Sequence, residues 1–439
     1  MGLRGALRSH WSTRPMGERV WLSVAALLSL GALCSRVHNA FAYPPLHDFD
    51  GPGHALNVFA FYQGRLPDLR SWIGFHPPLY HAVGALLWHG LPQGIPVHAA
   101  LRLLSALAGF GAVALTWRVL LRVVSPVDAA IAATLAVCIP MVAIATSMLG
   151  NETACALFST WLLLRLTNLP EDVERAPRHA LWTGFAGGLA ALCKSTGLLA
   201  IGVAGLAYAF RYRSNPRRAA LAVAATGGIA LLLTAPHSLR LLVESGGSPF
   251  AIVSGAAMSP ELEAEMRSHP PGERHLADYI TLPAATFLAP VYSAPGLERS
   301  VPGLLYASLW ADGHAQFLPD NVRAVRFAAV ALTILGLVPS ALAVRGLVRM
   351  LRSTDRRRRF GYPLLFAALL FLSLLDYTWI FPTYAAVKAS YLLPALLPAC
   401  AALAFGLESL GVGLGACLRA GLLGIAAASL VFTWWGWWQ

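Results

Sequence analysis

The sequence predicts an all-α polytopic membrane protein that crosses the bilayer about eleven times. Of its 439 residues, 57% are hydrophobic and only 12% are charged, and the mean hydropathy is +0.60. Because soluble proteins carry about 25% charged residues, this composition excludes a soluble enzyme and a disordered chain. The apolar runs are long and continuous, whereas the strands of an outer-membrane barrel alternate apolar and polar residues, so a barrel is also excluded.

Apolar runs near the length of a bilayer span mark the expected transmembrane helices. The first covers 19–37 and follows four arginines within the first 19 residues, which predicts a cytoplasmic N-terminus. A cleaved signal peptide ending at 40–42 is the alternative to a retained first helix. The other ten spans, which leave the C-terminus outside, are expected near 97–124, 129–146, 153–169, 180–193, 197–210, 219–236, 326–348, 363–381, 391–407 and 418–435.

The net charge of +12 comes almost entirely from arginine, and most of the arginines fall in loops predicted to be cytoplasmic. The run Arg356–Arg359 is therefore interpreted as a topology signal, with an anionic-lipid site as the alternative. The six cysteines show no metal-ligand spacing and are expected to be inert core residues. Four tryptophans near the C-terminus predict an interfacial aromatic belt.

The chain is expected to form a single domain over 1–439, with two substantial outer loops at 38–96 and 237–322. Within the first loop, the apolar run 79–91 is too short to span comfortably and is expected to lie as a helix in the interface. The predicted cytoplasmic loops are short, and no P-loop or dinucleotide fingerprint occurs. Any chemistry is therefore expected on the outer face, without a cytosolic nucleotide.

The strongest chemical signal is the segment HDFDGPGH, residues 47–54, just beyond the first span. Its carboxylates, Asp48 and Asp50, lie at the rim of a low-dielectric region, where a general base can be tuned. An acidic turn that caps the helix expected from Gly53 is the structural alternative. Zn²⁺ or Mn²⁺ bound by His47, Asp48, Asp50 and His54 is not favoured, because the spacing matches no strong signature. No cofactor is expected.

Two further motifs supply candidate binding residues. In residues 76–81, HPPLYH, two prolines fix the backbone and direct His76 and Tyr80, although the same prolines suit a simple helix start. Glu152 lies at the outer end of a predicted span, where ionisable residues are functional candidates. An acidic residue that favours the helix dipole is the alternative for Glu152.

Lys194 and Lys388 are the only lysines, and both are predicted at the outer face against the positive-inside trend. A lipid phosphate would account for two cations there, whereas snorkelling is the structural alternative.

The long outer loop adds Arg240, the acidic segment 260–267 and the motif 310–314. These segments are expected either to cover the site or to form a structural cap.

Together, these motifs resemble the GT-C superfamily of membrane glycosyltransferases. The closer similarity is to protein O-mannosyltransferases and lipid A aminoarabinose transferases. It rests on the acidic motif, the following His-Pro-Pro-Leu-Tyr element, the span opening with Leu101–Ser105, and the positions of the two lysines. The resemblance covers most of the chain. It implies sugar transfer from a polyprenyl-phosphate carrier to a lipid, glycan or protein acceptor, on the extracytoplasmic face of the inner or plasma membrane. No nucleic-acid partner is expected.

The resemblance also implies residue roles. Asp50 matches the family's proposed base, whereas Gly51 stands where the family often has a glutamate, so either Asp48 compensates or the acceptor differs. Lys194 matches a family lysine near the carrier phosphate, and Lys388 is carried over less directly.

The mechanism expected from these roles is one direct displacement with inversion at the anomeric carbon. Asp50 would deprotonate the acceptor. Three cations would stabilise the leaving phosphate, namely Lys194, Lys388 and Arg240. The residues expected to position sugar or acceptor are His54, His76, Tyr80, Glu152 and Tyr391. A flippase or transporter of lipid-linked sugars and a non-catalytic envelope-assembly protein remain the alternatives.

Overall fold

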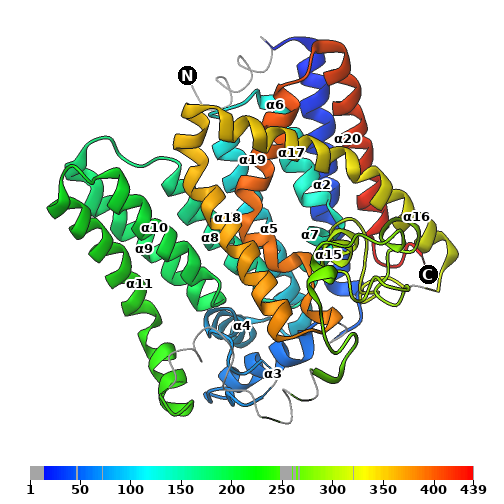
Figure 1. The fold of residues 1–439 in the computed structure, drawn as a ribbon. Helices are drawn as coiled ribbons and strands as arrows, with labels where there is room; N and C mark the ends of the chain where they lie inside the picture. The colour runs from blue at the N-terminus through cyan, green and yellow to red at the C-terminus, as the bar shows by residue number, and fades with distance from the viewer. Residues whose placement is uncertain are drawn as a thin grey trace.

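The computed structural model describes residues 14–45, 48–71, 73–247, 260, 264, 267–319 and 321–438. Within these residues the regular structure is helical, apart from one isolated β-bridge between Pro271 and Thr383 (Figure 1). The first half comprises α2 (Met16–Ala42), α3 (Gly51–Tyr62), α4 (Leu79–Gly90), α5 (Val97–Leu120), α6 (Pro126–Cys138), α7 (Pro140–Ala145), α8 (Glu152–Leu166), η1 (Val173–Arg175), α9 (Ala176–Cys193), α10 (Gly197–Arg211) and α11 (Pro216–Glu244). The second half comprises η2 (Leu276–Tyr279), α14 (Ala285–Leu288), α15 (Val301–Trp310), α16 (Arg323–Leu335), α17 (Leu337–Arg352), α18 (Thr354–Ile380), η3 (Tyr384–Ala386), η4 (Ala389–Ala395), α19 (Leu396–Glu408) and α20 (Val412–Phe432).

Seven helical segments of the described chain are long and apolar enough to cross a membrane, so the protein is an integral membrane protein. They are Met16–Ala42, Val97–Leu120, Pro216–Glu244, Arg323–Arg352, Thr354–Ile380, Tyr384–Glu408 and Gly413–Phe432. Each coincides with a predicted span. The other four predicted spans correspond to α6 with α7, α8, α9 and α10, which are shorter or less apolar. The number of crossings and the orientation stay predictions.

The predicted span 129–146 is broken at Pro140, which begins α7 after α6 has ended at Cys138. Proline lacks the N–H that would continue the helix. Arg36, buried on α2, donates to the carbonyl of Val137 at 2.6 Å and to Thr146 Oγ1 at 3.0 Å. The guanidinium therefore satisfies polar groups near a break that lies among apolar helices.

The helices that bear the candidate residues run between the same two ends of the bundle, and the candidate residues lie at one of these ends. α8 starts at Glu152 and α10 follows Lys194, whereas α18 runs the opposite way and ends shortly before Lys388. We call this the site end, and α3 and α4 lie there (Figure 1). The other end, where α8 and α10 finish and α18 begins with Arg356–Arg359, is called the arginine-rich end.

The segment 267–319, within the predicted loop 237–322, packs against the chain that leads to Lys388, whereas residues 237–244 of that predicted loop continue α11. The amide of Tyr384 donates to the carbonyl of Pro270 at 2.8 Å, and Arg274 Nη2 donates to the carbonyl of Thr383 at 3.2 Å. The ring of Tyr292 stacks on that of Tyr384, with centroids 4.1 Å apart. The loop is therefore anchored beside the site end. Most of the predicted acidic segment 260–267 lies outside the described residues.

Close backbone contact joins α17 and α19. A side chain at Gly346 would collide with the carbonyl oxygen of Ala402, and one at Gly406 would collide with that of Leu342. Helices in membranes approach this closely only where small residues allow it. These glycines hold α19 in place, and η4, which begins directly after Lys388, leads into α19.

We expect Gly346→Val to lower thermal stability, because overpacking a tight contact costs about 1–3 kcal/mol and the backbone of α19 has to move. The matched control is Gly228→Val in α11, where an added side chain meets nothing within 4 Å. Thermal unfolding of the purified variants in detergent measures the difference. Equal unfolding temperatures for the two variants would contradict the packing argument.

Candidate functional site

Asp50 occupies the residue before α3, but its side chain makes no capping hydrogen bond. Instead, Lys388 Nζ donates to Asp50 Oδ2 at 3.3 Å, joining residues 338 positions apart. Lys388 is 5% exposed and its Nζ also lies 4.6 Å from the ring centre of Phe49. The side chain of Asp50 therefore faces a buried cation, and helix capping does not describe it.

A second ion pair joins Lys194 and Glu152. Lys194 is the residue after α9 and Glu152 is the first residue of α8, and their side chains meet at 2.9 Å between Nζ and Oε1. Both side chains are largely shielded, with 16% and 14% exposure. The two predicted signals, a lone lysine and a terminal glutamate, are thus one feature in the fold.

The two ion pairs meet at the ring of Tyr391. Lys194 Nζ lies 4.1 Å from the ring centre and Lys388 Nζ lies 5.7 Å from it. Ammonium groups near an aromatic face are stabilised by the ring quadrupole. We call Asp50, Glu152, Lys194, Lys388 and Tyr391 the lysine cluster. It brings five of the predicted residues together from four distant parts of the chain.

Three histidines lie beside the lysine cluster, of which His54 and His81 are buried and His76 is partly exposed. His54 Nδ1 and His81 Nε2 are 2.9 Å apart, and the rings of His54 and His76 meet edge to face at 5.6 Å. Asn151 Nδ2 donates to His76 Nδ1 at 3.2 Å and to the carbonyl of Cys193 at 2.7 Å. Burial lowers the pKa of His54 and lowers that of His76 to about 3. Both rings are therefore neutral hydrogen-bonding groups at physiological pH.

The charge of Asp50 is set by two opposing effects. Burial is the largest single effect and disfavours its carboxylate, but the neighbouring ammonium of Lys388 and smaller electrostatic effects together keep the pKa of Asp50 below its ordinary value. Asp50 is thus ionised at neutral pH. With two carboxylates and two ammonium groups in contact, the lysine cluster is balanced in charge.

Asp48 has a different environment from Asp50. Its Oδ2 accepts from Arg102 Nη2 at 3.4 Å and from the amide of Leu149 at 3.3 Å, and both charged side chains are fully buried. Burial raises the pKa of Asp48 to about 7. Arg102 also donates to the carbonyls of Tyr43 at 2.6 Å and Pro44 at 2.7 Å. Asp48 therefore serves to hold the loop in these contacts.

Gly51 lies in a position that leaves no room for a side chain. A side chain at this position would collide with Cβ and Oδ2 of Asp48. The space next to Asp50 in the sequence is thus occupied by the carboxyl group of Asp48, which enters from the preceding turn. A glutamate at position 51 has no room while Asp48 is in this position.

Two predicted residues make other contacts. The Tyr80 hydroxyl lies 3.3 Å from Ser105 Oγ and accepts from the amide of Gly150 at 3.3 Å, which positions the start of α8. Arg240 pairs with Glu244 at 2.7 Å and donates to the carbonyl of Pro67 at 2.6 Å. Among the described residues, Arg240 makes no ion pair or hydrogen bond with either lysine.

The motif 310–314 packs against the site loop. His314 meets the ring of Phe49 edge to face at 5.5 Å, and Asp312 Oδ2 accepts from the amides of Phe317 and Leu318. Trp435, predicted in the interfacial belt, meets Tyr43 edge to face at 4.6 Å. His47 lies outside the described residues. Among those described, no group of three His, Cys, Asp or Glu is arranged to hold a metal ion, and all six cysteines are free.

Sequence reasoning missed Arg102, His81 and Tyr377 as site residues. Arg102 gives a usable signal, because an arginine inside an otherwise apolar span calls for a partner. His81 belongs to the motif 76–81, but nothing in the sequence assigned it a role. Tyr377, whose ring meets that of Tyr391 at 5.9 Å, lies in a long apolar helix where an aromatic residue carries no distinguishing signal.

The comparisons with known proteins give a consistent result. Residues 76–239, a little over a third of the chain, match the family described as dolichyl-phosphate-mannose-protein mannosyltransferase. No curated protein sequence matches the chain.

Three solved structures share its fold. ArnT from Cupriavidus metallidurans bound to undecaprenyl phosphate is 16% identical, with a TM-score of 0.51 over 88% of this chain and 60% of ArnT. The Archaeoglobus fulgidus oligosaccharyltransferase with Zn and sulfate is 16% identical, with a TM-score of 0.54 over 94% of this chain and 52% of that one. AglB from the same organism, with an inhibitory peptide and a dolichol-phosphate, is 15% identical, with a TM-score of 0.55 over 96% and 56%.

The chain therefore has the GT-C fold, which confirms the resemblance at the level of fold. It spans only about half to three fifths of the length of these structures.

We expect Arg102→Met to destabilise the protein, because the carbonyls of Tyr43 and Pro44 and the carboxyl of Asp48 lose their donor, at about 1–3 kcal/mol for each buried group left unsatisfied. Arg118→Met, an exposed arginine of the same helix, is the matched control. Adding Asp48→Asn to Arg102→Met should recover little of the loss, because the carboxyl of Asp48, whose pKa is already raised to about 7 beside Arg102, is neutral once the arginine is gone. Thermal unfolding of the four proteins tests this, and equal losses for Arg102→Met and Arg118→Met would refute it.

Proposed function

We propose that this protein is a glycosyltransferase that moves a sugar from a polyprenyl-phosphate carrier to an acceptor on the extracytoplasmic face, with inversion. The observation that carries this proposal is the convergence of Lys194 and Lys388 on Tyr391, with the ionised Asp50 beside them. Cations suited to a phosphate and a carboxylate suited to a base thus lie within one largely shielded cluster.

The donor's phosphate would be recognised by the two ammonium groups. In the absence of donor their charges are balanced by Asp50 and Glu152. A carrier phosphate offers strong acceptors to both lysines and competes with those carboxylates. Its arrival would release Asp50 from Lys388, leaving the carboxylate available to the acceptor.

The transfer step requires one bond to form and one to break. Asp50 accepts the proton of the acceptor hydroxyl while that oxygen attacks the anomeric carbon. The bond between the anomeric carbon and the phosphate oxygen breaks, and the polyprenyl phosphate leaves with the bonding electrons. Lys194 and Lys388 stabilise the charge that develops on the leaving oxygen. Attack opposite to the leaving group inverts the anomeric centre.

Neutral His54 and His76 are suited to hydrogen-bond sugar hydroxyls, because they lie beside the carboxylates without adding charge. The solved structures support the carrier class, since ArnT is bound to undecaprenyl phosphate and AglB to a dolichol-phosphate. The family match supports mannose as the first sugar to test.

We expect Asp50→Asn to lower transfer by about 10²–10⁴-fold, the usual contribution of a general base, while polyprenyl phosphate binding is kept. The assay follows release of undecaprenyl phosphate from undecaprenyl-phosphate mannose in liposomes that also contain a membrane extract as the source of acceptor, and binding is measured with undecaprenyl phosphate alone. Asp68→Asn, an exposed acid of the same loop, is the control and should be fully active. Full activity of Asp50→Asn would remove the base assignment and favour the transporter alternative.

We expect Lys388→Gln to move the acid limb of the pH–activity profile toward neutral pH. In the native protein Lys388 keeps the pKa of Asp50 low, so activity falls only as pH drops through that lowered pKa. Without Lys388, burial raises the pKa of Asp50 and activity falls at higher pH. Residual transfer by the variant is measured as kcat/KM across pH, because this ratio reports the pKa of Asp50 in the enzyme before the donor phosphate draws Lys388 away.

The matched control for this profile is Lys194→Gln, because Lys194 pairs with Glu152 and not with Asp50. It should lower transfer through weaker phosphate binding and leave the acid limb near its native position. An unmoved limb in Lys388→Gln, or equal movement in both variants, would show that the Lys388 contact does not set the ionisation of the base.

A further inference from the structure

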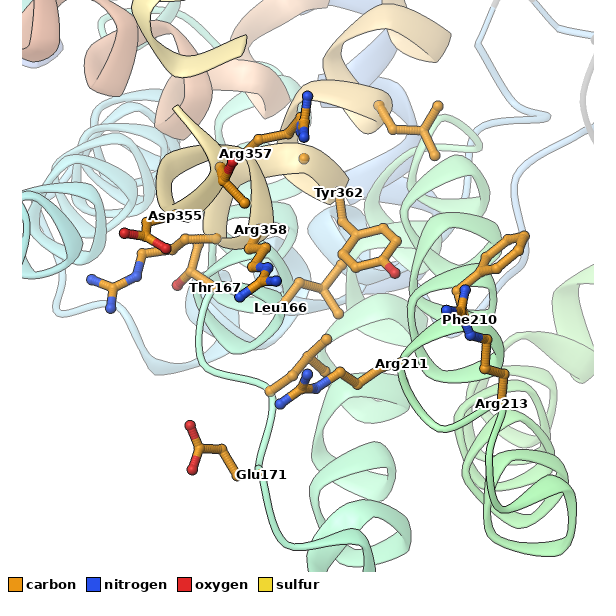
Figure 2. Close-up of a pocket in the computed structure, with 15 residues that line it drawn as sticks. Leu166, Thr167, Glu171, Phe210, Arg211, Arg213, Asp355, Arg357, Arg358 and Tyr362 are labelled. Atoms are coloured by element: carbon orange, nitrogen blue, oxygen red, sulfur yellow. The ribbon is translucent and has the colours of Figure 1, made fainter. Parts of the chain in front are cut away.

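A cavity of about 1210 Å³ opens at the arginine-rich end, opposite to the lysine cluster along α8, α10 and α18 (Figure 2). Its walls come from the end of α8 and the following loop, from the end of α10 and from the first turns of α18. Five arginines line it against two carboxylates, namely Arg211, Arg213, Arg357, Arg358 and Arg359 against Glu171 and Asp355.

We propose that this cavity binds the phosphate-bearing headgroup of an anionic membrane lipid from the leaflet at that end. The predicted orientation makes this the cytoplasmic leaflet. Basic recesses between transmembrane helices are suited to anionic headgroups, because they concentrate positive charge at the depth of the lipid phosphates. The site is separate from the lysine cluster and does not depend on the proposed transferase activity.

The arginines that line the cavity lack protein partners among the described residues. Within the described chain, none of the five arginine side chains makes an ion pair or a hydrogen bond to protein. By contrast, Arg356 on the same turn pairs with Glu408 at 2.6 Å and lies 4.2 Å from the ring centre of Phe405. The cavity thus gathers five arginines that the described fold leaves without a neutralising partner.

The walls of the cavity combine charged and apolar side chains. Figure 2 shows Arg211 and Arg358 on facing elements, with Tyr362 and Leu166 beside them. Phe210 and Leu365 also line the cavity and expose 60% and 37% of their surface. Apolar walls next to arginines suit a molecule with a charged head and a hydrocarbon chain, whereas a free anion would use only the arginines.

The cavity lies between two groups of helices. α9, α10 and α11 form an arm on one side of the molecule, and α18 belongs to the central bundle (Figure 1). A headgroup held by Arg211 and Arg358 would join the arm to the bundle. Binding of the lipid should therefore raise the unfolding temperature of the whole chain.

The test titrates the purified full-length protein in neutral detergent with dioctanoyl-phosphatidylglycerol, dioctanoyl-phosphatidylcholine and inorganic phosphate, following the unfolding temperature and the dissociation constant. We expect saturable stabilisation by phosphatidylglycerol alone. Arg211→Gln/Arg358→Gln should weaken its binding by more than tenfold, because each basic residue near a lipid phosphate is worth about fivefold in affinity. Phe210→Ala should also weaken it, by removing apolar wall.

The matched control is Arg349→Gln/Arg352→Gln, which removes two arginines from the same end of the bundle but outside the cavity, and it should bind as the native protein does. Equal loss in control and cavity variants would show diffuse attraction and overturn the site. Equal binding of phosphatidylcholine or of inorganic phosphate would overturn the headgroup assignment. If the cavity variant is not recovered folded, Arg357→Gln/Arg359→Gln provides the same test.

Discussion

The geometry of the lysine cluster depends on one buried cation, Arg102. Its guanidinium reaches from α5 to two consecutive carbonyls at the end of α2 and to the carboxyl group of Asp48. A buried guanidinium has a large desolvation cost, which only several well-placed acceptors can offset. Because these acceptors lie just before Asp50, the chain leaves the membrane along one path and presents Asp50 to Lys388. The catalytic proposal thus rests on a residue that touches no substrate.

The second constraint is the mutual neutralisation of the lysine cluster. Isolated ammonium groups in so shielded a place would be costly, and isolated carboxylates would be equally so. Pairing each lysine with one carboxylate and placing Tyr391 between them keeps all four groups charged in a closed fold. The same pairing makes the arrangement responsive to an added anion, because a phosphate can replace either carboxylate at little cost in unpaired charge.

Hydropathy was sufficient to locate the long apolar helices, since seven of the expected spans are recovered as such. α3 and α4 were also anticipated, because proline and glycine mark their starts. The sequence could not predict which charged residues pair when they are far apart along the chain. Nothing local indicates that Asp50 meets Lys388, or that Asp48 turns toward Arg102 while Asp50 does not. Arg240 looked equivalent to the lysines by charge, but a glutamate one turn away and the carbonyl of Pro67 engage it.

The shortness of α8 has a consequence for where the reaction takes place. Its 15 residues extend about 22 Å at 1.5 Å per residue, whereas the hydrocarbon core of a bilayer is about 30 Å thick. If Arg165 and Arg211 at the arginine-rich end lie at one boundary, Glu152, one helix length of about 20 Å from Arg165, stops about 10 Å short of the other boundary. Lys194, paired with Glu152, lies at the same depth. A carrier lipid could then deliver its phosphate without leaving the membrane, while bulk water, the competing acceptor that would waste the donor, is kept at a distance.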